Sequence, residues 1–143
     1  MTRVRRERTV ASAPRRVWEV VEDPHHLPRW WPGVARVEAV TDDRFTEVHV
    51  TKRGRPVRLD FRLVQSDPPS VRRWEQELAG TPFERVLNKA VTEIRLEARP
   101  PGTHVTIEQR QQLRGYSRTG GLLLRRATGK RLAQALARLE QIC

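Results

Sequence analysis

The stretch from Pro14 to Gly33 constrains this fold more than any other part of the sequence. Four prolines and one glycine interrupt it, so it cannot form one long helix. Three of the four tryptophans of the chain lie within it, and apolar residues at helical spacing follow Pro14. It holds no nucleophile and no cluster of metal ligands. We expect two short helices that form the wall or lid of an apolar cavity, which favours a binding protein over a hydrolase.

The rest of the chain changes from a two-residue to a 3.6-residue hydrophobic period near residue 119. Before that point, alternating apolar and polar residues predict strands separated by short turns rich in Gly, Pro and Asp. Short turns favour an antiparallel meander, and a meander of this length curls and needs a cover on its concave face. The predicted strands are 4–13, 34–41, 45–52, 57–63, 72–78, 86–98 and 105–113, and the predicted helix runs from about 119.

These elements predict an α+β fold, in which a curved seven-stranded antiparallel sheet surrounds a long C-terminal helix and two short helices follow the first strand. The length of 143 residues fits one ligand-binding domain, 1–143. No apolar run is long enough to cross a membrane, and no apolar stretch of a secretory signal follows the basic N-terminus. Cys143 is the one cysteine, which excludes an internal disulfide. We expect a cytoplasmic protein.

The net charge of +11 is concentrated at the two ends of the chain. Residues 1–16 hold six Arg and one Glu, residues 114–143 hold six Arg, one Lys and one Glu, and the region between them is neutral overall. Two basic ends fit a surface that binds nucleic acid or lipid headgroups. A compositional preference for Arg, which supplies 25 of the 28 cations, is the simpler explanation, because charge runs are usually solvated faces. Aromatic residues are not interleaved with the arginines, so we do not expect nucleic acid.

The order of these elements and several short motifs resemble the helix-grip superfamily of START, Bet v 1-like and polyketide-cyclase proteins, also called SRPBCC. In particular the sequence is similar to the polyketide cyclase/dehydrase and lipid transport branch. The resemblance covers essentially the whole chain and implies that an apolar ligand such as a lipid, sterol, polyketide or hormone binds in a central cavity, although some members are aromatases or cyclases. The matching motifs are VASAP (10–14), VW (17–18), DP (23–24), LPRWWPG (27–33), DPP (67–69), GTHV (102–105) and ALARL (135–139).

The candidate cavity residues combine aromatic and amide side chains. The resemblance places Trp30 and Trp31 where the second short helix closes the cavity, although packing against the sheet explains at least one of them. Gln109 and Gln111 lie on an otherwise apolar strand face, where they bind a polar group of the ligand or pair with each other, with Gln76 or with water. The full candidate set is Trp30, Trp31, Phe61, Trp74, Gln76, Ile94, Gln109, Gln111 and Tyr116.

Three arginines are candidates for binding an acidic group of the ligand. Arg6 and Arg8 share a strand face with Val4 and Val10, and Arg72 lies near the start of its strand. A guanidinium binds carboxylate or phosphate through a rigid fork of donors. The alternative is that these arginines are solvated, because Arg is rarely buried without a partner.

Titratable groups give little support for catalysis. His25 and His26 are adjacent, so they do not share one helix side, and we interpret His49 and His104 as outward-facing. We expect no metal and no cofactor. Cyclase chemistry needs an acid or base inside the cavity, and the sequence offers no obvious base there.

The leading hypothesis is therefore the binding or transport of a small hydrophobic ligand, and the expected partner is a small apolar molecule. The alternative is a polyketide cyclase/aromatase-like enzyme, which requires a titratable group with a strongly shifted pKa facing the cavity. A second alternative is a basic surface that contacts an anionic membrane or nucleic acid. This requires that residues 1–16 and 114–143 form one face. The sequence leaves the oligomeric state and the ligand's identity open.

Overall fold

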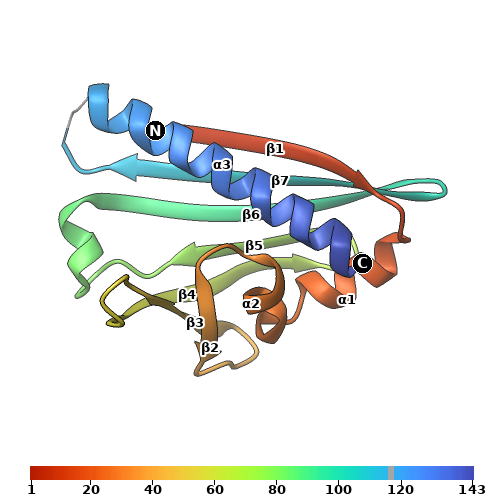
Figure 1. The fold of residues 1–143 in the computed structure, drawn as a ribbon, viewed down its shortest axis with the longest axis horizontal. Coiled ribbons are helices and arrows are strands. Elements are labelled where there is room, and N and C mark those ends of the chain that lie inside the picture. The colour runs from red at the N-terminus through yellow and green to blue at the C-terminus, as the bar shows by residue number, and fades with distance from the viewer. Residues whose placement is uncertain (116–117) are drawn as a thin grey trace.

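One antiparallel sheet and one long helix dominate the computed structural model, which describes residues 1–115 and 118–143 (Figure 1). The sheet has seven strands in the order β1-β7-β6-β5-β4-β3-β2. The α+β fold and the seven-stranded sheet predicted from the sequence are confirmed. The elements are β1 (Thr2–Val10), α1 (Pro14–Val21), η1 (Pro24–His26), α2 (Leu27–Trp30), β2 (Val34–Glu38), β3 (Arg44–Val50), β4 (Pro56–Asp67), β5 (Val71–Gln76), η2 (Pro82–Arg85), β6 (Leu87–Arg99), β7 (Gly102–Leu113) and α3 (Arg118–Ile142).

Proline, aspartate and glycine divide the first helical segment. Pro14 begins α1, where its missing N–H has no intrahelical partner to lose. The Asp23 carboxylate accepts a hydrogen bond from the backbone N–H of His25 at 3.0 Å, and this cap starts η1. Gly33 ends the segment at a φ of +86°, a conformation that side chains with a Cβ rarely adopt. The segment therefore folds back on itself at one end of the sheet.

The first strand completes the sheet beside the last one. β1 pairs antiparallel with β7, from Thr2 opposite Gln111 to Val10 opposite Thr103. A Cβ at Gly102 would overlap the Val10 carbonyl, so a glycine is required where β7 begins. α3 packs against β1 and β7 and runs diagonally over the sheet (Figure 1). Residues from both ends of the chain thus lie side by side.

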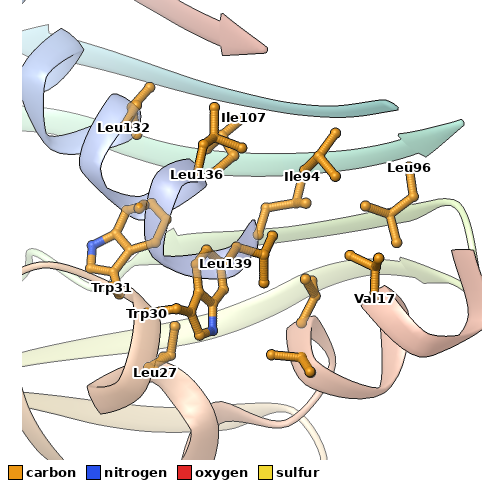
Figure 2. Close-up of a cluster of buried hydrophobic side chains, with 14 of the residues drawn as sticks. Val17, Leu27, Trp30, Trp31, Ile94, Leu96, Ile107, Leu132, Leu136 and Leu139 are labelled. Atoms are coloured by element: carbon orange, nitrogen blue, oxygen red, sulfur yellow. The ribbon is translucent and has the colours of Figure 1, made fainter. Parts of the chain in front are cut away.

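The core lies where the second half of α3 faces the sheet. Figure 2 shows Leu132, Leu136 and Leu139 of α3 beside Ile94 and Ile107 of β6 and β7, and each of these side chains is at most 2% exposed. Trp18, Trp30 and Trp31 close the end of this core, and all three are buried.

Three details differ from the sequence prediction. β1 ends at Val10 rather than at residue 13, because the chain leaves the sheet to start α1. On α3, the helix face predicted from Leu124, Ala127 or Thr128, Ala135, Leu136, Leu139 and Ile142 takes Thr128, which is fully buried, rather than Ala127, which is exposed, and it also includes Leu132, which is fully buried. The extra η2 between β5 and β6 forms where Pro82 interrupts the strand pattern.

Candidate functional site

A cavity lies between the inner face of the sheet, the end of α2 and the middle of α3. Its volume is about 60 Å³, which is room for roughly four waters. Apolar and polar residues line it in similar numbers. The apolar ones are Trp31, Leu59, Phe61, Trp74, Ala90 and Val91, and the polar ones are Glu47, His49, Gln76, Thr92, Gln109, Gln111 and Arg131.

The register of the strands brings these side chains together. Phe61 of β4 lies opposite Gln76 of β5. Trp74 of β5 lies opposite Thr92 of β6, which in turn lies opposite Gln109 of β7. Because directly opposite residues point to the same face of a sheet, the row of cavity residues continues across four strands.

Aromatic rings build the apolar wall. The ring centroids of Trp31 and Trp74 lie 6.2 Å apart in an edge-to-face arrangement, and Phe45 and Phe61 stack with centroids 5.1 Å apart. Phe45 also contacts Trp74 edge-to-face at 5.9 Å. These geometries are those that aromatic pairs prefer, so this wall is well packed.

The amide groups in the cavity are only partly satisfied. Gln109 Nε2 donates to Thr92 Oγ1 at 2.9 Å, and Thr128 Oγ1 of α3 donates to Gln111 Oε1 at 3.1 Å. Gln76 Nε2 and Gln109 Oε1 are buried and find no hydrogen-bond partner within the described part of the chain. Each such group costs about 1–3 kcal/mol of folding free energy. The cavity therefore presents one free donor and one free acceptor.

A buried carboxyl group also faces the cavity. Glu47 of β3 is 3% exposed, and its Oε1 lies 3.0 Å from His49 Nε2. Burial raises the pKa of Glu47 above its ordinary value, against the hydrogen bond from His49 and the positive charges of His49 and Arg131. His49 was expected to face outward, and this was wrong. It follows Phe45 and Glu47 at two-residue spacing, and all three point inward.

An open cleft adjoins the cavity. Its volume is about 550 Å³, and it lies between the β3–β4 hairpin, η2 and the middle of α3. Its apolar residues include Val57 and Phe83, and Lys130 lies at its α3 side. Leu59, His49 and Arg131 line both the cavity and the cleft, so these three side chains separate the interior from solvent.

The structure brings together six of the nine predicted cavity residues, but not the others. Trp30 and Ile94 are fully buried in the apolar core and do not line the cavity, so they differ from the prediction. Trp30 packs edge-to-face on Trp31, with ring centroids 5.4 Å apart. Tyr116 lies outside the described residues. The six that line the cavity are Trp31, Phe61, Trp74, Gln76, Gln109 and Gln111.

The three predicted anion-binding arginines lie outside the cavity. Arg8 is exposed and forms an ion pair with Glu140 of α3. Arg6 is also exposed, and its guanidinium lies next to Gly129 of α3. Arg72 donates to Ser66 Oγ at 3.1 Å. Burial lowers the pKa of Arg72, and the charges of Glu22 and Asp23 oppose this effect. The interior cation is instead Arg131, which makes no ion pair within the described part of the chain.

The described residues contain no group of three or more His, Cys, Asp or Glu side chains placed to hold a metal ion. Among the helices of the same residues, none has the length and apolar character needed to cross a membrane.

The sequence matches the family described as polyketide cyclase/dehydrase and lipid transport over residues 1–143. This chain belongs to that family. The membership confirms the resemblance seen in the motifs. No curated protein matches the sequence.

Solved structures share the fold. The di-domain ARO/CYC BexL from the BE-7585A biosynthetic pathway matches with a TM-score of 0.79 at 20% identity, over 99% of this chain and 46% of BexL. The di-domain ARO/CYC StfQ from the steffimycin pathway matches with a TM-score of 0.78 at 15% identity, over 97% and 49%. Protein MLL2253 from Mesorhizobium loti matches with a TM-score of 0.71 at 22% identity, over 98% and 95%. The chain thus spans about half of each di-domain protein, and these identities show the fold alone.

Proposed function

We propose that this protein binds one small, mainly apolar molecule whose body occupies the open cleft and whose polar end reaches the inner cavity. The volumes support this division. Small-molecule sites typically measure about 300–1,000 Å³, so the cleft of about 550 Å³ is large enough for a ligand and the cavity of about 60 Å³ is not. Because His49, Leu59 and Arg131 line both spaces, the ligand passes between these side chains.

The observation that carries this proposal is the pair of unpaired amide atoms in the cavity. Gln109 Oε1 needs a donor and Gln76 Nε2 needs an acceptor. Oxygen-bearing groups on a ligand supply both, because a hydroxyl or carbonyl oxygen accepts from Gln76 Nε2 and a hydroxyl proton donates to Gln109 Oε1. The polar end therefore carries at least one hydroxyl or enol group.

Native mass spectrometry of the protein purified gently from its own host tests the binding. We expect a stoichiometric adduct, and organic extraction then identifies the molecule. In Gln76→Leu/Gln109→Leu the adduct is expected to be lost, whereas Gln141→Leu, an exposed glutamine of α3, retains it. Failure to recover any adduct from the wild-type protein, or equal adducts in all three proteins, would overturn the proposal.

Glu47 favours a second candidate function, acid–base catalysis on the bound molecule. A carboxyl group whose pKa burial raises keeps its proton nearer neutral pH, where it can give that proton to a ligand oxygen and take it back. His49, at 3.0 Å, is placed to exchange the proton with Glu47. This pair meets the requirement that the sequence left unmet, and it fits proton transfer next to a carbonyl group, the step that cyclisation and dehydration share.

Deuterium exchange separates the enzyme from the binder. The extracted molecule is incubated with the protein in D₂O, and mass spectrometry then follows deuterium entering its carbon positions or its conversion to a product. A catalyst exchanges or converts the molecule in wild type, and Glu47→Gln abolishes this while the adduct persists. Binding without exchange in either protein would leave the carrier function alone.

A further inference from the structure

The two basic ends of the chain meet in one groove. β1 and the first half of α3 enclose a hollow of about 420 Å³, which five arginines line: Arg3, Arg5, Arg6, Arg125 and Arg126. No carboxylate is among the described residues that line it. We call it the β1–α3 groove. It is separate from the cavity and the cleft described above.

Three of these arginines have no carboxylate partner within the described part of the chain. Arg3 pairs with Glu108 at 3.3 Å and Arg5 with Glu7 at 2.9 Å. Arg6, by contrast, donates to the Arg5 carbonyl, and Arg125 donates to the Arg3 carbonyl at 3.5 Å.

Most arginines on the remaining strands are neutralised by glutamates. The exceptions among the described residues are Arg72, which donates to Ser66, and Arg99. The pairs are Arg36 and Arg58 with Glu38, Arg44 with Glu77, Arg62 with Glu75, Arg73 and Arg95 with Glu93, and Arg110 with Glu108. The groove differs from this pattern because three arginines without a carboxylate partner line one hollow.

A glycine within α3 lies beside one of these cations. A Cβ at Gly129 would meet the Arg6 guanidinium, so the end of the Arg6 side chain lies directly against the helix at this point. The absence of a side chain at Gly129 therefore leaves room for an unpaired guanidinium next to α3.

A large exposed apolar side chain lines the same groove, and a second one follows it in the sequence. Leu122 lines it and is 64% exposed, and Leu123 is 60% exposed. Leu122, Arg125, Arg126 and Gly129 share one side of α3 by the three- and four-residue spacing of a helix. Exposed leucines beside unpaired cations are typical of helices that lie at a lipid interface.

We propose that the β1–α3 groove docks on a membrane surface that contains anionic phospholipids. Arg6, Arg125 and Arg126 bind phosphate groups, and Leu122 and Leu123 enter the boundary with the acyl chains. The flanking apolar residues are aliphatic rather than aromatic, so they suit a lipid surface better than the stacked bases of a single-stranded nucleic acid.

Cosedimentation with phosphatidylcholine vesicles, with and without phosphatidylglycerol, tests the proposal. We expect binding to the anionic vesicles only, and binding that weakens as salt is added. Each arginine near an anionic surface contributes about a fivefold change in affinity, so Arg6→Gln/Arg125→Gln/Arg126→Gln should lose roughly 100-fold. The matched control removes three exposed arginines outside the groove, in Arg53→Gln/Arg55→Gln/Arg99→Gln, and should lose far less.

A reporter variant shows whether the leucines enter the membrane. The native tryptophans are buried, so the fluorescence of Leu122→Trp reports on that position against a steady background. We expect its emission to shift to shorter wavelength on anionic vesicles, and Leu122→Ser/Leu123→Ser to bind them more weakly. Equal losses in the two triple variants, no vesicle binding by the wild type, or an oligonucleotide that displaces the vesicles would each overturn the proposal.

Discussion

The two halves of the space under α3 differ, although the same helix and the same sheet enclose both. Around Leu132, Leu136 and Leu139 the interface is apolar and closed. One to two turns earlier, around Thr128 and Arg131, α3 covers a cavity that contains a buried carboxyl, three glutamines and an imidazole. The backbone arrangement is therefore the same in both halves. The difference comes from the side chains that the strands place opposite each turn of α3.

The two halves also contribute differently to folding. Burying leucine and isoleucine in the closed half stabilises the fold by about 1.5–3 kcal/mol for each side chain. In the cavity half, unpaired amide atoms and a desolvated carboxyl oppose folding. Groups that oppose folding yet lie together in one cavity are typical of a binding site, so the closed half supports the site that the other half holds.

Truncating the closed half has the largest expected effect. Leu136→Ala removes a side chain that is 2% exposed and leaves a void, so the free energy of unfolding should fall by about 2–5 kcal/mol. Urea denaturation followed by tryptophan fluorescence measures it. The control Leu122→Ala, at a position that is 64% exposed, should change stability by at most about 0.5 kcal/mol. A loss under about 1 kcal/mol for Leu136→Ala would mean that this half is not the closed core.

Replacing the buried carboxyl should raise stability in a pH-dependent way. The pKa of Glu47 is raised in the folded protein, so the stability that the protonated carboxyl confers is fully present below the unfolded value of 4.5 and is lost as pH rises through the folded pKa. The amide of Glu47→Gln does not ionise, so the variant does not lose this stability. We expect equal stability near pH 4 and a gain on the order of 1–3 kcal/mol for the variant at neutral pH.

Urea titrations of both proteins across this pH range check the prediction, with the exposed Glu84→Gln as the control. A gain for Glu47→Gln that is the same at every pH would show that charge burial at Glu47 is not its cause.

Local periodicity predicted the order of the strands and of the long helix, together with five of the six cavity residues, and the family resemblance predicted the sixth, Trp31. Glu47 and His49 were missed, although they alternate with Phe45, because charged and polar strand residues are usually solvated. Their inward position follows once Phe45 is placed inside. Arg8 could not be predicted in the same way, because its partner Glu140 lies 132 residues away and only the packing of α3 on β1 brings them together.

Removing one unpaired amide tests the cavity half directly. Gln76→Leu replaces a donor that has no partner within the described residues by an apolar group of similar size, so stability should rise by about 1 kcal/mol. Gln112→Leu, at an exposed position of β7, should be close to neutral. A clear loss of stability in Gln76→Leu, measured by the same urea titration, would indicate that the amide has a bonding partner in the folded protein.

The smallest expected effect lies at the boundary between the two halves. Thr128 is fully buried and donates to Gln111 Oε1 at 3.1 Å. Thr128→Val keeps the volume but leaves that oxygen unpaired, so it should cost about 1 kcal/mol. In a Gln111→Leu background no oxygen is left unpaired, and the same substitution should cost little. The expected coupling energy of this double-mutant cycle is about 0.5–1 kcal/mol. A coupling energy near zero would mean that water, rather than Thr128, donates a hydrogen bond to Gln111 Oε1. The hydrated part of the cavity would then reach past Thr128 towards the closed core.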